Sequence, residues 1–411
     1  MKPLDADVIV VGAGMVGAAF AAALAESRLS VALIDAGPPP ALLTSDHYDL
    51  RVSAISPGTQ SILQAVGAWE RLDSSRIEPY QSMYVWDASS RGSIRFDAAE
   101  LGVPWLGHII ENSNIHHALL RSLDAAANIH YRFDTPPASL DITEGRCRLL
   151  LKGGGAMAAR LVVGADGAGS WLRSELGIPV KSRLYGQRAF VCEVRTERPH
   201  QRTAWQRFLP TGPVAFLPLA NGGCSVVWTC DAALAAELEA LDAAVFGERL
   251  AGVFDGKLGG VEVVGAVRGF DLARRQASSY VVERAALIGD AAHVVHPMAG
   301  QGANLGFGDA WSLASVLLRA ESEERDIGRR HVLRRYERWR RSENFSMIRM
   351  LDGLHVLFSS DSGIVRGARG LGLDAVDRGK WLKHVLARQA LGEPVPGTSG
   401  GELPEFRVFP G

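Results

Sequence analysis

The sequence has 411 residues, of which 47% are hydrophobic and 22% charged, and its formal net charge is -1. This length suits two domains with a substantial core, and the composition is that of a globular protein. A net charge near zero gives no general attraction to nucleic acid, so we expect no nucleic-acid partner. The four cysteines form no Cys-x-x-Cys motif, which argues against a zinc site or a redox-active pair.

The beginning of the chain has the pattern of a βαβ unit. Residues 7–11 form a short apolar run rich in β-branched residues, typical of a strand covered on both faces. Residues 18–26 are alanine-rich and predict a helix, and residues 30–34 predict a second strand. Residues 8–25 are uncharged, but their glycines and the strand that follows favour a nucleotide-binding unit over a signal peptide or membrane span. We therefore expect a cytoplasmic protein whose contacts with membranes are peripheral.

A G-x-G-x-x-G motif lies between the first strand and the helix. It consists of Gly12, Gly14 and Gly17, and Asp35 ends the second strand. The first glycine permits a tight turn, the second lets the backbone approach a pyrophosphate, and the third allows close packing of helix and strand. The helix N-terminus attracts phosphate, and Asp35 is placed to accept hydrogen bonds from a ribose. The motif predicts a dinucleotide site but does not distinguish FAD from NAD.

Further along the chain, the pattern indicates a second domain. Ser56-Pro57 predicts the N-cap and first turn of a helix. Residues 80–97 and 185–229 are rich in strand and turn signals, and a hairpin is predicted around Asn221-Gly222-Gly223. Because further buried strands are predicted after these blocks, we expect the nucleotide domain to be threaded in pieces through the second domain.

Two later motifs place glycine and aspartate at the end of an apolar strand. They are Gly164-Ala165-Asp166-Gly167 and, after residues 285–288, Gly289-Asp290. Together and in this order, they resemble the DG and GD motifs of the flavoprotein aromatic hydroxylases with the p-hydroxybenzoate hydroxylase fold. The resemblance implies an α/β protein in which a Rossmann-type FAD-binding domain is interleaved with a β-sheet substrate domain, followed by C-terminal helices. No second G-x-G-x-x-G follows, so NAD(P)H is expected to bind transiently.

The resemblance also implies roles for individual residues. It places Gly289-Asp290 at the ribitol chain of FAD, gives Asp166 and Gly167 a role near both FAD and NAD(P)H, and matches Arg51 to a flavin-contacting arginine. Backbone amides at the start of the helix after Asp290 would stabilise negative charge on the reduced flavin. The flavin-edge segment supplies His296, Pro297, Gly300, Gly302, Ala303 and Asn304. His296 and Pro297 would line the flavin ring and are the candidate catalytic residues.

Two other histidines are open to a functional interpretation. His108 is a conceivable partner for a phenol, and His293 stands close to the GD motif. A histidine at a strand end or beside a buried turn is more often packed than catalytic, and we favour that interpretation for both.

The similarity to the ubiquinone-biosynthesis ring hydroxylases extends over essentially the whole chain. The stretches that carry it are residues 51–56, 106–113, 164–173, 215–219, 289–309, 333–338 and 388–392. Residues 106–113 and 170–173 most resemble the branch that oxidises C5 of a 2-polyprenylphenol. Sister branches oxidise C1 or C6, and Val294-Val295 and Ser113-Asn114 depart from the usual pattern, so these ring positions remain open.

The resemblance implies a monooxygenase that uses FAD, NAD(P)H and O2 to hydroxylate a polyprenylated phenol through a C4a-hydroperoxyflavin. A hydroxylase of a small phenol and a non-catalytic scaffold subunit are the alternatives. A polyprenyl tail requires a route from a membrane or lipid-binding partner. The basic stretches 329–341 and 379–391 could contact the inner membrane or a ubiquinone-synthesis complex, although such stretches are more often solvated faces. The oligomeric state is left open.

The expected domain organisation has six segments. Three belong to the FAD-binding domain, two to the substrate domain and one to a helical tail. In chain order they are FAD-binding 1–79, substrate strands 80–108, FAD-binding 109–184, substrate sheet 185–280, FAD-binding 281–350, and tail 351–411.

Overall fold

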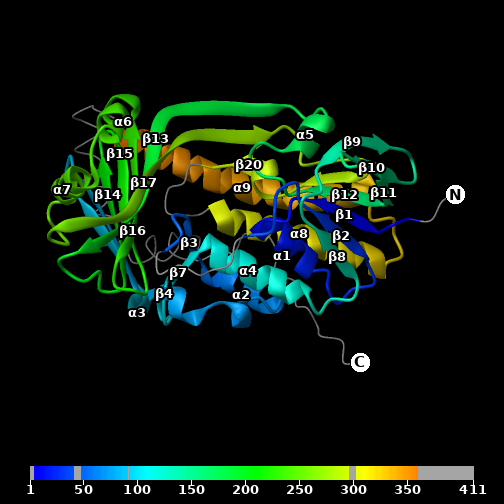
Figure 1. Ribbon diagram of the computed structural model, residues 1–411, viewed down its shortest axis with the longest axis horizontal. Coiled ribbons are helices and arrows are strands. Elements are labelled where there is room, and N and C mark those ends of the chain that lie inside the picture. The colour runs from blue at the N-terminus through cyan, green and yellow to red at the C-terminus, as the bar shows by residue number, and fades with distance from the viewer. Residues whose placement is uncertain (1–3, 41–47, 91, 296–301, 360–411) are drawn as a thin grey trace.

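The computed structural model describes residues 4–40, 48–90, 92–295 and 302–359, with side chains described as far as residue 344. Two sheets dominate this part of the chain and lie at opposite ends of the molecule (Figure 1). Within the described residues, no helix combines the length and the apolar character that a membrane span needs.

The first large sheet contains the predicted βαβ unit. The described part of this sheet has six strands in the order β18-β19-β12-β1-β2-β8, and β1 pairs in parallel with both β2 and β12. In chain order the strands are β1 (Val8–Val11), β2 (Val31–Ile34), β8 (Ile129–Arg132), β12 (Leu161–Gly164), β18 (Val281–Val282) and β19 (Ala285–Leu287). The helices of this end are α1 (Met15–Ala22), α2 (Pro57–Ala65), α4 (Asn112–Leu123), α5 (Trp171–Glu175) and α8 (Gly302–Ser322). Every residue of β1, β2 and β12 is buried, as their continuous apolar runs predict.

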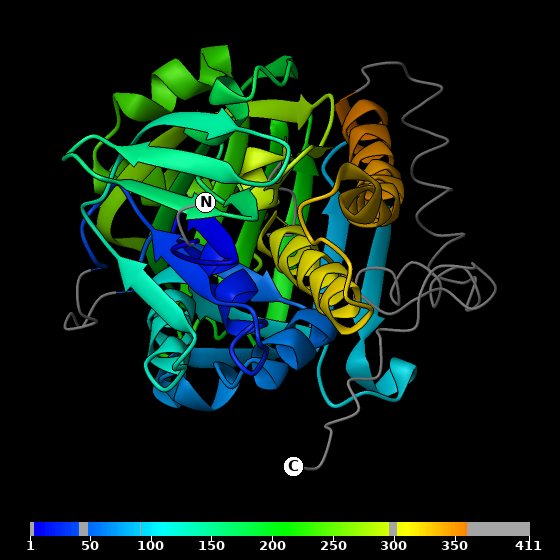
Figure 2. The same ribbon diagram turned by 90° about the vertical axis from the view of Figure 1, so that its right-hand side faces the viewer.

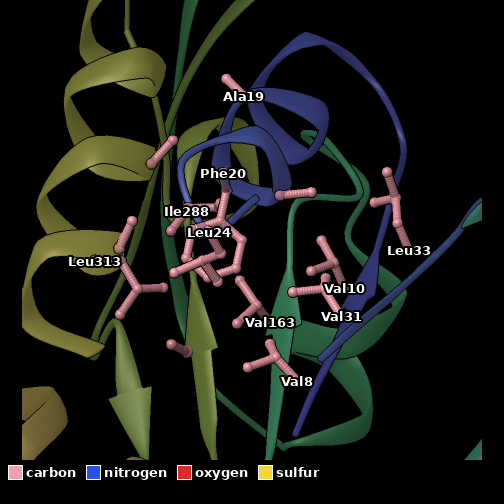
Figure 3. Close-up of a cluster of buried hydrophobic side chains, with 14 of the residues drawn as sticks. Val8, Val10, Ala19, Phe20, Leu24, Val31, Leu33, Val163, Ile288 and Leu313 are labelled. Atoms are coloured by element: carbon pink, nitrogen blue, oxygen red, sulfur yellow. The ribbon is translucent and has the colours of Figure 1, made fainter. Parts of the chain in front are cut away.

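The core of this end is formed between the sheet and the helices α1 and α8 (Figure 3). Phe20 and Leu24 lie between the strand residues Val8, Val163 and the helix residue Leu313, and all five are fully buried. Each large apolar side chain buried in this way contributes about 1.5–3 kcal/mol. This packing fixes the ends of β1, β12 and β19 beside the N-terminus of α1.

The second large sheet has eight strands in the described part, in the order β20-β17-β13-β16-β15-β14-β5-β6. They are β5 (Ser82–Asp87), β6 (Ser93–Asp97), β13 (Val180–Thr196), β14 (Thr203–Leu209), β15 (Gly212–Pro218), β16 (Cys224–Asp231), β17 (Val261–Ala277) and β20 (His293–Val294). One face packs on α6 (Ala232–Glu239) and α7 (Ala243–Val253). The strands β13 and β17 are 17 residues long and extend from this sheet toward α5 at the other end of the molecule (Figure 1).

Two smaller sheets and a long helix complete the described fold. One sheet joins β3 (Val52–Ile55), β7 (Gly107–Glu111) and β4 (Ile77–Tyr80). The other joins β9 (Pro137–Ile142), β10 (Cys147–Leu151) and β11 (Ala156–Ala159). The short helices are α3 (Ala98–Leu101), η1 (Trp69–Arg71), η2 (Ser74–Arg76) and η3 (Gly289–Ala291). The long helix α9 (Arg330–Ser359) lies beside α8 (Figure 2) and also contacts β14 and β15, so it reaches both ends of the molecule.

Several local predictions are confirmed, and one boundary is wrong. The Ser56 side chain caps α2 by accepting a hydrogen bond from Thr59 N, and β15 and β16 form the predicted hairpin. The first helix was expected over residues 18–26 but runs from Met15 to Ala22. It starts earlier because Gly14 is its N-cap, with φ -65° and ψ -178°.

Candidate functional site

The glycines of the G-x-G-x-x-G turn serve two different purposes. Gly12 has φ +104°, and a Cβ there would lie 2.4 Å from the carbonyl oxygen of Ala165. A Cβ on Gly17 would lie 1.9 Å from the carbonyl oxygen of Gly12. A Cβ on Gly14 would meet no described atom within 4 Å. Gly12 and Gly17 are therefore required by the packing of the protein, whereas the space beside Gly14 is open to a ligand.

Asp35 holds this turn in place and keeps acceptor capacity for a ligand. Its Oδ2 accepts a hydrogen bond from Ala13 N at 2.7 Å, and its Oδ1 accepts one from Gly37 N at 2.8 Å. Each carboxylate oxygen has further lone pairs, which suit ribose hydroxyls. On the other side, His116 Nε2 lies 2.6 Å from the carbonyl oxygen of Ala13, so this nitrogen carries the proton and donates. Sequence reasoning missed His116 because 103 residues separate it from Ala13.

The N-terminus of α1 fits a bound anion. It has no side-chain cap and no acidic residue in its first turn, so the positive end of the helix dipole is not neutralised locally. The open space at Gly14 lies at this same helix end. The arrangement therefore matches a dinucleotide pyrophosphate in both charge and space.

The DG motif forms a tight loop after β12. The carboxylate of Asp166 accepts hydrogen bonds from Ser170 Oγ at 2.6 Å and from Leu172 N at 3.0 Å, and it thereby supports the start of the short helix α5, whose N-cap is Ser170. Gly167 has φ +76°, a conformation that favours glycine, and a Cβ there would meet no described atom within 4 Å. The expected role of Asp166 and Gly167 near FAD and NAD(P)H stays a prediction.

Arg173 links the DG loop to the GD turn. Its guanidinium is buried and donates to the carbonyl oxygens of Ala168 and Ala291, both at 2.9 Å. Arg275 of β17 donates to the same Ala168 oxygen at 3.0 Å. Desolvation and the nearby charge of Arg275 lower the pKa of Arg173, while Asp166 opposes this shift. Two cations from different elements therefore fix the position of one loop.

The GD turn packs directly on the first turn of α1. Gly289 has φ +60°, and a Cβ there would lie 3.1 Å from a methyl group of Val16. The next residue, Asp290, is exposed to solvent, yet the surrounding protein desolvates its carboxyl group and raises its pKa. Arg51 and His293 oppose this shift through their charges. A carboxyl group that solvent reaches although protein surrounds it lies in a recess, which suits a group that binds the hydroxyls of a ligand.

Arg51 and Asn304 connect the neighbouring segments to this recess. The Arg51 guanidinium lies over the ring of Phe270 at 5.3 Å and is close enough to Asp290 to influence its pKa. The Asn304 amide donates to Ala54 O at 2.8 Å and accepts from Ser56 N at 3.1 Å, which ties the start of α8 to the end of β3. The structure thus brings the Arg51 segment, the GD turn and the start of α8 together.

The remaining predicted flavin-edge residues divide into two groups. Gly302 and Ala303 form the first turn of α8, and a Cβ on Gly302 would meet no described atom within 4 Å. His296, Pro297 and Gly300 lie outside the described residues. The expected contacts of all five residues with the flavin stay predictions.

Both histidines favoured as packed are buried. His293 Nε2 lies 2.5 Å from Asp309 Oδ2, with 2% of the residue exposed. His108 lies between the rings of Trp69 and Trp105, with centroid distances of 5.0 and 5.1 Å. Desolvation lowers the pKa of His108 to about 4, so it is neutral at physiological pH. The interpretation of both as packed residues is confirmed.

An open row of small apolar side chains crosses the second large sheet. Val191, Val227 and Ala215 are register partners on adjacent strands, and each is half-buried. They lie on the face opposite α6 and α7, because their sequence neighbours Cys192 and Val226 belong to the core beneath those helices. The row continues through residues Gln206 and Val85, which are both buried.

This row lies on the Arg51 side of the sheet. Phe270, which contacts Arg51, is the register partner of Ala189, and Ala189 shares its face with Val191. Glu193 is on the same face and accepts a hydrogen bond from the backbone N–H of Tyr48 at 3.3 Å. The row therefore lies on the same face of the sheet as Phe270, the residue that contacts Arg51, and could form the floor of an active site.

Comparisons with known proteins agree with this geometry. The family model described as "FAD binding domain" matches residues 5–349. The chain is 36% identical to 3-demethoxyubiquinol 3-hydroxylase of Escherichia coli, covering 94% of this chain and 98% of the relative. It is 38% identical to ubiquinone hydroxylase UbiL of Rhodospirillum rubrum, with 94% and 90% covered. It is 34% identical to the human ubiquinone biosynthesis monooxygenase COQ6, with 92% and 91% covered.

Solved structures confirm the expected fold. The p-nitrophenol 4-monooxygenase PnpA of Pseudomonas putida superposes with a TM-score of 0.76 at 19% identity, covering 96% of this chain and all of the other. Klebsiella pneumoniae HpxO, solved with FAD and uric acid, superposes with a TM-score of 0.73 at 18% identity, with 94% and 97% covered.

Proposed function

The chain belongs to the FAD-dependent aromatic-ring monooxygenases that include the ubiquinone-biosynthesis hydroxylases, and we propose that its substrate is a polyprenylated phenol. Bound FAD would supply the redox chemistry: two electrons from NAD(P)H would reduce O2, with one oxygen atom inserted into the ring and the other released as water. The protein must bind the cofactor, orient the ring and exclude water.

We propose that the predicted residues hold the cofactor. The turn before α1 binds the pyrophosphate, Asp35 a ribose, and Asp290 the ribitol, while Arg51 and the start of α8 face the flavin. The full set is Gly12, Gly14, Gly17, Asp35, Arg51, Asp166, Gly167, Gly289, Asp290, Pro297, Gly300, Gly302, Ala303 and Asn304, with His296 beside Pro297 at the flavin edge. The open space at Gly14 and the recess at Asp290 support this assignment.

The open apolar row is the observation that carries the substrate proposal. Val191, Val227 and Ala215 present aliphatic surface on this face. The row contains no charged side chain from Val191 to Val85, and the exposed Arg268 of β17 lies beside its Val191 end. This aliphatic surface suits a substrate with an apolar substituent.

The second large sheet supports the predicted division into segments, although its short edge strand β20 comes from residues 281–350. The strands β5 and β6, from residues 80–108, join β13–β17, from residues 185–280, in one sheet. We therefore propose that these two segments together form the substrate domain, and that the FAD-binding domain comes from residues 1–79, 109–184 and 281–350.

We place the new hydroxyl group at C5 of a 2-polyprenylphenol. The support is the similarity of residues 106–113 and 170–173 to the branch that oxidises this position. The name of the E. coli relative specifies another substrate, 3-demethoxyubiquinol, so oxidation at a different ring position is the main competing outcome.

The test is NADH or NADPH oxidation by the FAD-loaded protein, with 2-prenylphenols of increasing tail length and with untailed phenol. We expect oxidation to rise with the tail, and product mass and NMR to show one added oxygen at C5. Equal stimulation by untailed phenol would favour the small-phenol alternative, and oxygen at another carbon would overturn the C5 assignment.

A pair of matched variants tests the apolar row. Val227→Phe adds bulk to the half-buried row, whereas Val245→Phe changes an exposed residue on α7, beyond the opposite face of the sheet. We expect Val227→Phe to lower kcat/KM for the prenylated phenol at least tenfold, about 1.4 kcal/mol, while FAD content and Val245→Phe activity stay normal. Normal kcat/KM in Val227→Phe would remove the row from the substrate site.

We further propose that α9 docks on an anionic membrane surface. Arg330, Arg334 and Arg338 are exposed at four-residue spacing, so they lie on one side of the helix, and none forms an ion pair with a described residue. Other arginines of the same stretch are neutralised, including Arg329 by Glu283 and Asp326, and Arg335 by Glu323. The second basic stretch, 379–391, lies outside the described residues.

Sedimentation with vesicles tests this docking. Phosphatidylglycerol vesicles should bind the wild type and release it at high salt, whereas phosphatidylcholine vesicles should not bind it. Changing the three exposed arginines to glutamine should abolish binding without altering FAD content. If this variant binds phosphatidylglycerol vesicles as well as the wild type does, the three exposed arginines do not contact lipid and the proposal is refuted.

A further inference from the structure

A buried network of charged groups lies beneath the GD turn. Asp309 of α8 is fully buried, and its Oδ2 accepts hydrogen bonds from Gly289 N at 3.0 Å and from His293 Nε2 at 2.5 Å. Its Oδ1 accepts one from Arg340 Nε of α9 at 2.7 Å. Asp309 thus joins the GD turn, the strand after it and the long helix α9.

The carboxyl group of Asp309 is ionised in this setting. Burial would raise its pKa, but His293 and Arg340 together lower it to about 2. An ionised carboxylate only accepts hydrogen bonds, so the Nε2 atom of His293 must carry the proton. Arg340 is also buried and donates to Leu305 O at 3.2 Å and to Asn344 Oδ1 at 3.0 Å. The bonds from Arg340 to Asp309 and Leu305 attach α9 to α8, whereas the bond to Asn344 lies within α9.

The GD turn depends on support from outside itself. It is a single 3₁₀ turn without a side-chain cap, and Gly289 has the left-handed φ of +60°. Its first N–H is held by Asp309 and its last carbonyl, that of Ala291, by Arg173. The orientation of Asp290 between these two anchors therefore depends on where Asp309 and Arg173 place the backbone.

We propose that Asp309 is the positioning residue of the Gly289-Asp290 turn for FAD, and that Arg340 makes this positioning depend on α9. The inference deepens the proposed function and rests on its assignment of Asp290 to the cofactor. Because α9 also contacts β14 and β15, the helix connects the cofactor turn to the sheet that carries the apolar row.

An ion pair between the buried Arg284 and the half-buried Asp326 offers a control elsewhere in the protein. Arg284 is 1% exposed and forms hydrogen bonds to Asp326 and to the carbonyl oxygens of Glu144 and Arg160. This pair contains no residue of the G-x-G-x-x-G, DG or GD motif. Asp326→Asn therefore shows how the loss of an ion pair away from the GD turn changes the melting temperature and the Kd for FAD.

The experiment measures release of FAD from the full-length holoenzyme after dilution, by recovery of flavin fluorescence, together with the melting temperature of the same samples. We expect Asp309→Asn to raise the Kd for FAD at least tenfold and to shift the visible flavin spectrum. Asp326→Asn should lower the melting temperature but keep the Kd for FAD within twofold of wild type. A Kd that is equally unchanged in Asp309→Asn would overturn the proposal.

Further variants test the role of Arg340. Arg340→Met leaves Asp309 as an unpaired buried charge, and we expect a Kd for FAD at least as high as in Asp309→Asn. If Arg340 acts through Asp309, the double variant Asp309→Asn/Arg340→Met should bind FAD no more weakly than Asp309→Asn alone. Additive effects would refute the dependence on α9, and the double variant also keeps the test valid if Arg340→Met fails to fold.

This outcome is separable from that of the proposed function. The FAD measurement needs no substrate, whereas hydroxylation of 2-prenylphenols is tested on the wild type. If the wild type binds FAD but oxidises no prenylated phenol, the substrate proposal fails while the positioning role of Asp309 can still be confirmed or refuted.

Discussion

Replacing Gly14 by alanine tests FAD binding without disturbing the stability of the protein. Gly14 has φ -65° and ψ -178°, which alanine adopts without strain, and its Cβ would meet no described atom within 4 Å. The neighbouring glycines differ, because a Cβ on Gly12 or Gly17 would collide with backbone atoms. Gly14→Ala therefore creates no steric clash with any described atom of the protein.

The expected effects on stability and binding have different sizes. Alanine at a compatible glycine position stabilises a protein by about 0.4–1 kcal/mol, because the unfolded chain has less entropy. Alanine is also a poorer N-cap than glycine by about the same amount, so the two effects nearly cancel. In contrast, a methyl group where the pyrophosphate must approach should weaken FAD binding at least tenfold, about 1.4 kcal/mol.

The assay combines urea unfolding of the FAD-free protein with titration of FAD. We expect the free energy of unfolding of Gly14→Ala to stay within about 1 kcal/mol of wild type while the Kd for FAD rises. Gly17→Ala serves as the contrast, because backbone cannot yield to a contact of 1.9 Å, and a loss above about 3 kcal/mol is expected. If Gly14→Ala binds FAD with unchanged Kd, the pyrophosphate does not approach Gly14 and the assigned site is wrong.

Three further predictions concern buried polar groups. The pKa of Asp309 is lowered from 3.8 to about 2, which contributes about 2 kcal/mol to the free energy of unfolding above pH 4. This contribution is lost as the pH falls through 2, and acid unfolding of Asp309→Asn should lack this loss. Burial lowers the pKa of His108 from 6.5 to about 4, so protonation of this residue should lower the free energy of unfolding by about 3 kcal/mol as the pH falls through this range. This pH dependence of stability should disappear in His108→Phe, while the pH profile of hydroxylation stays unchanged. Arg173→Met leaves the buried carbonyl of Ala291 without its donor, so urea unfolding should show a loss of about 2 kcal/mol, and unchanged stability would contradict the bridge between DG loop and GD turn.

Local signals in the sequence were sufficient for much of the fold. Ser56-Pro57 predicted a cap that the structure contains, because the cap and its partner Thr59 are three residues apart. The hairpin of β15 and β16 follows from a turn signal between two apolar runs. The strand β1 was predictable because burial on both faces requires a continuous apolar run.

The long strands β13 and β17 were not predicted at their full length. Residues 181–184 of β13 are exposed and include Lys181 and Arg183, so their composition gives no apolar run or alternation. They are strand because they pair with residues 273–276 of β17, almost a hundred positions away in the sequence. Such pairing is set by the tertiary structure and not by local preference.

The residues that hold the GD turn, Asp309, Arg340 and Arg173, could not be predicted from the sequence for the same reason. Asp309 and Arg340 are 31 residues apart, and Arg173 is 118 residues from the carbonyl of Ala291 that it holds. In the sequence, Asp309 is one acidic residue in a helix and Arg340 one of several arginines. Only the packing of α9 on α8 shows that this arginine is buried while Arg338 remains exposed.

The glycine motifs show where the sequence argument for a ligand is strong and where it is weak. Gly12, Gly17 and Gly289 are explained by contacts within the protein, so their presence alone would also suit a fold that has lost its cofactor. Gly167 faces open space but has φ +76°, which itself favours glycine, whereas Gly14 faces open space and has a φ that any residue adopts. A ligand that approaches the backbone supplies the missing reason at Gly14, where the helix end is uncapped. The case for a bound dinucleotide therefore rests most heavily on Gly14, the motif glycine that neither packing nor backbone conformation explains.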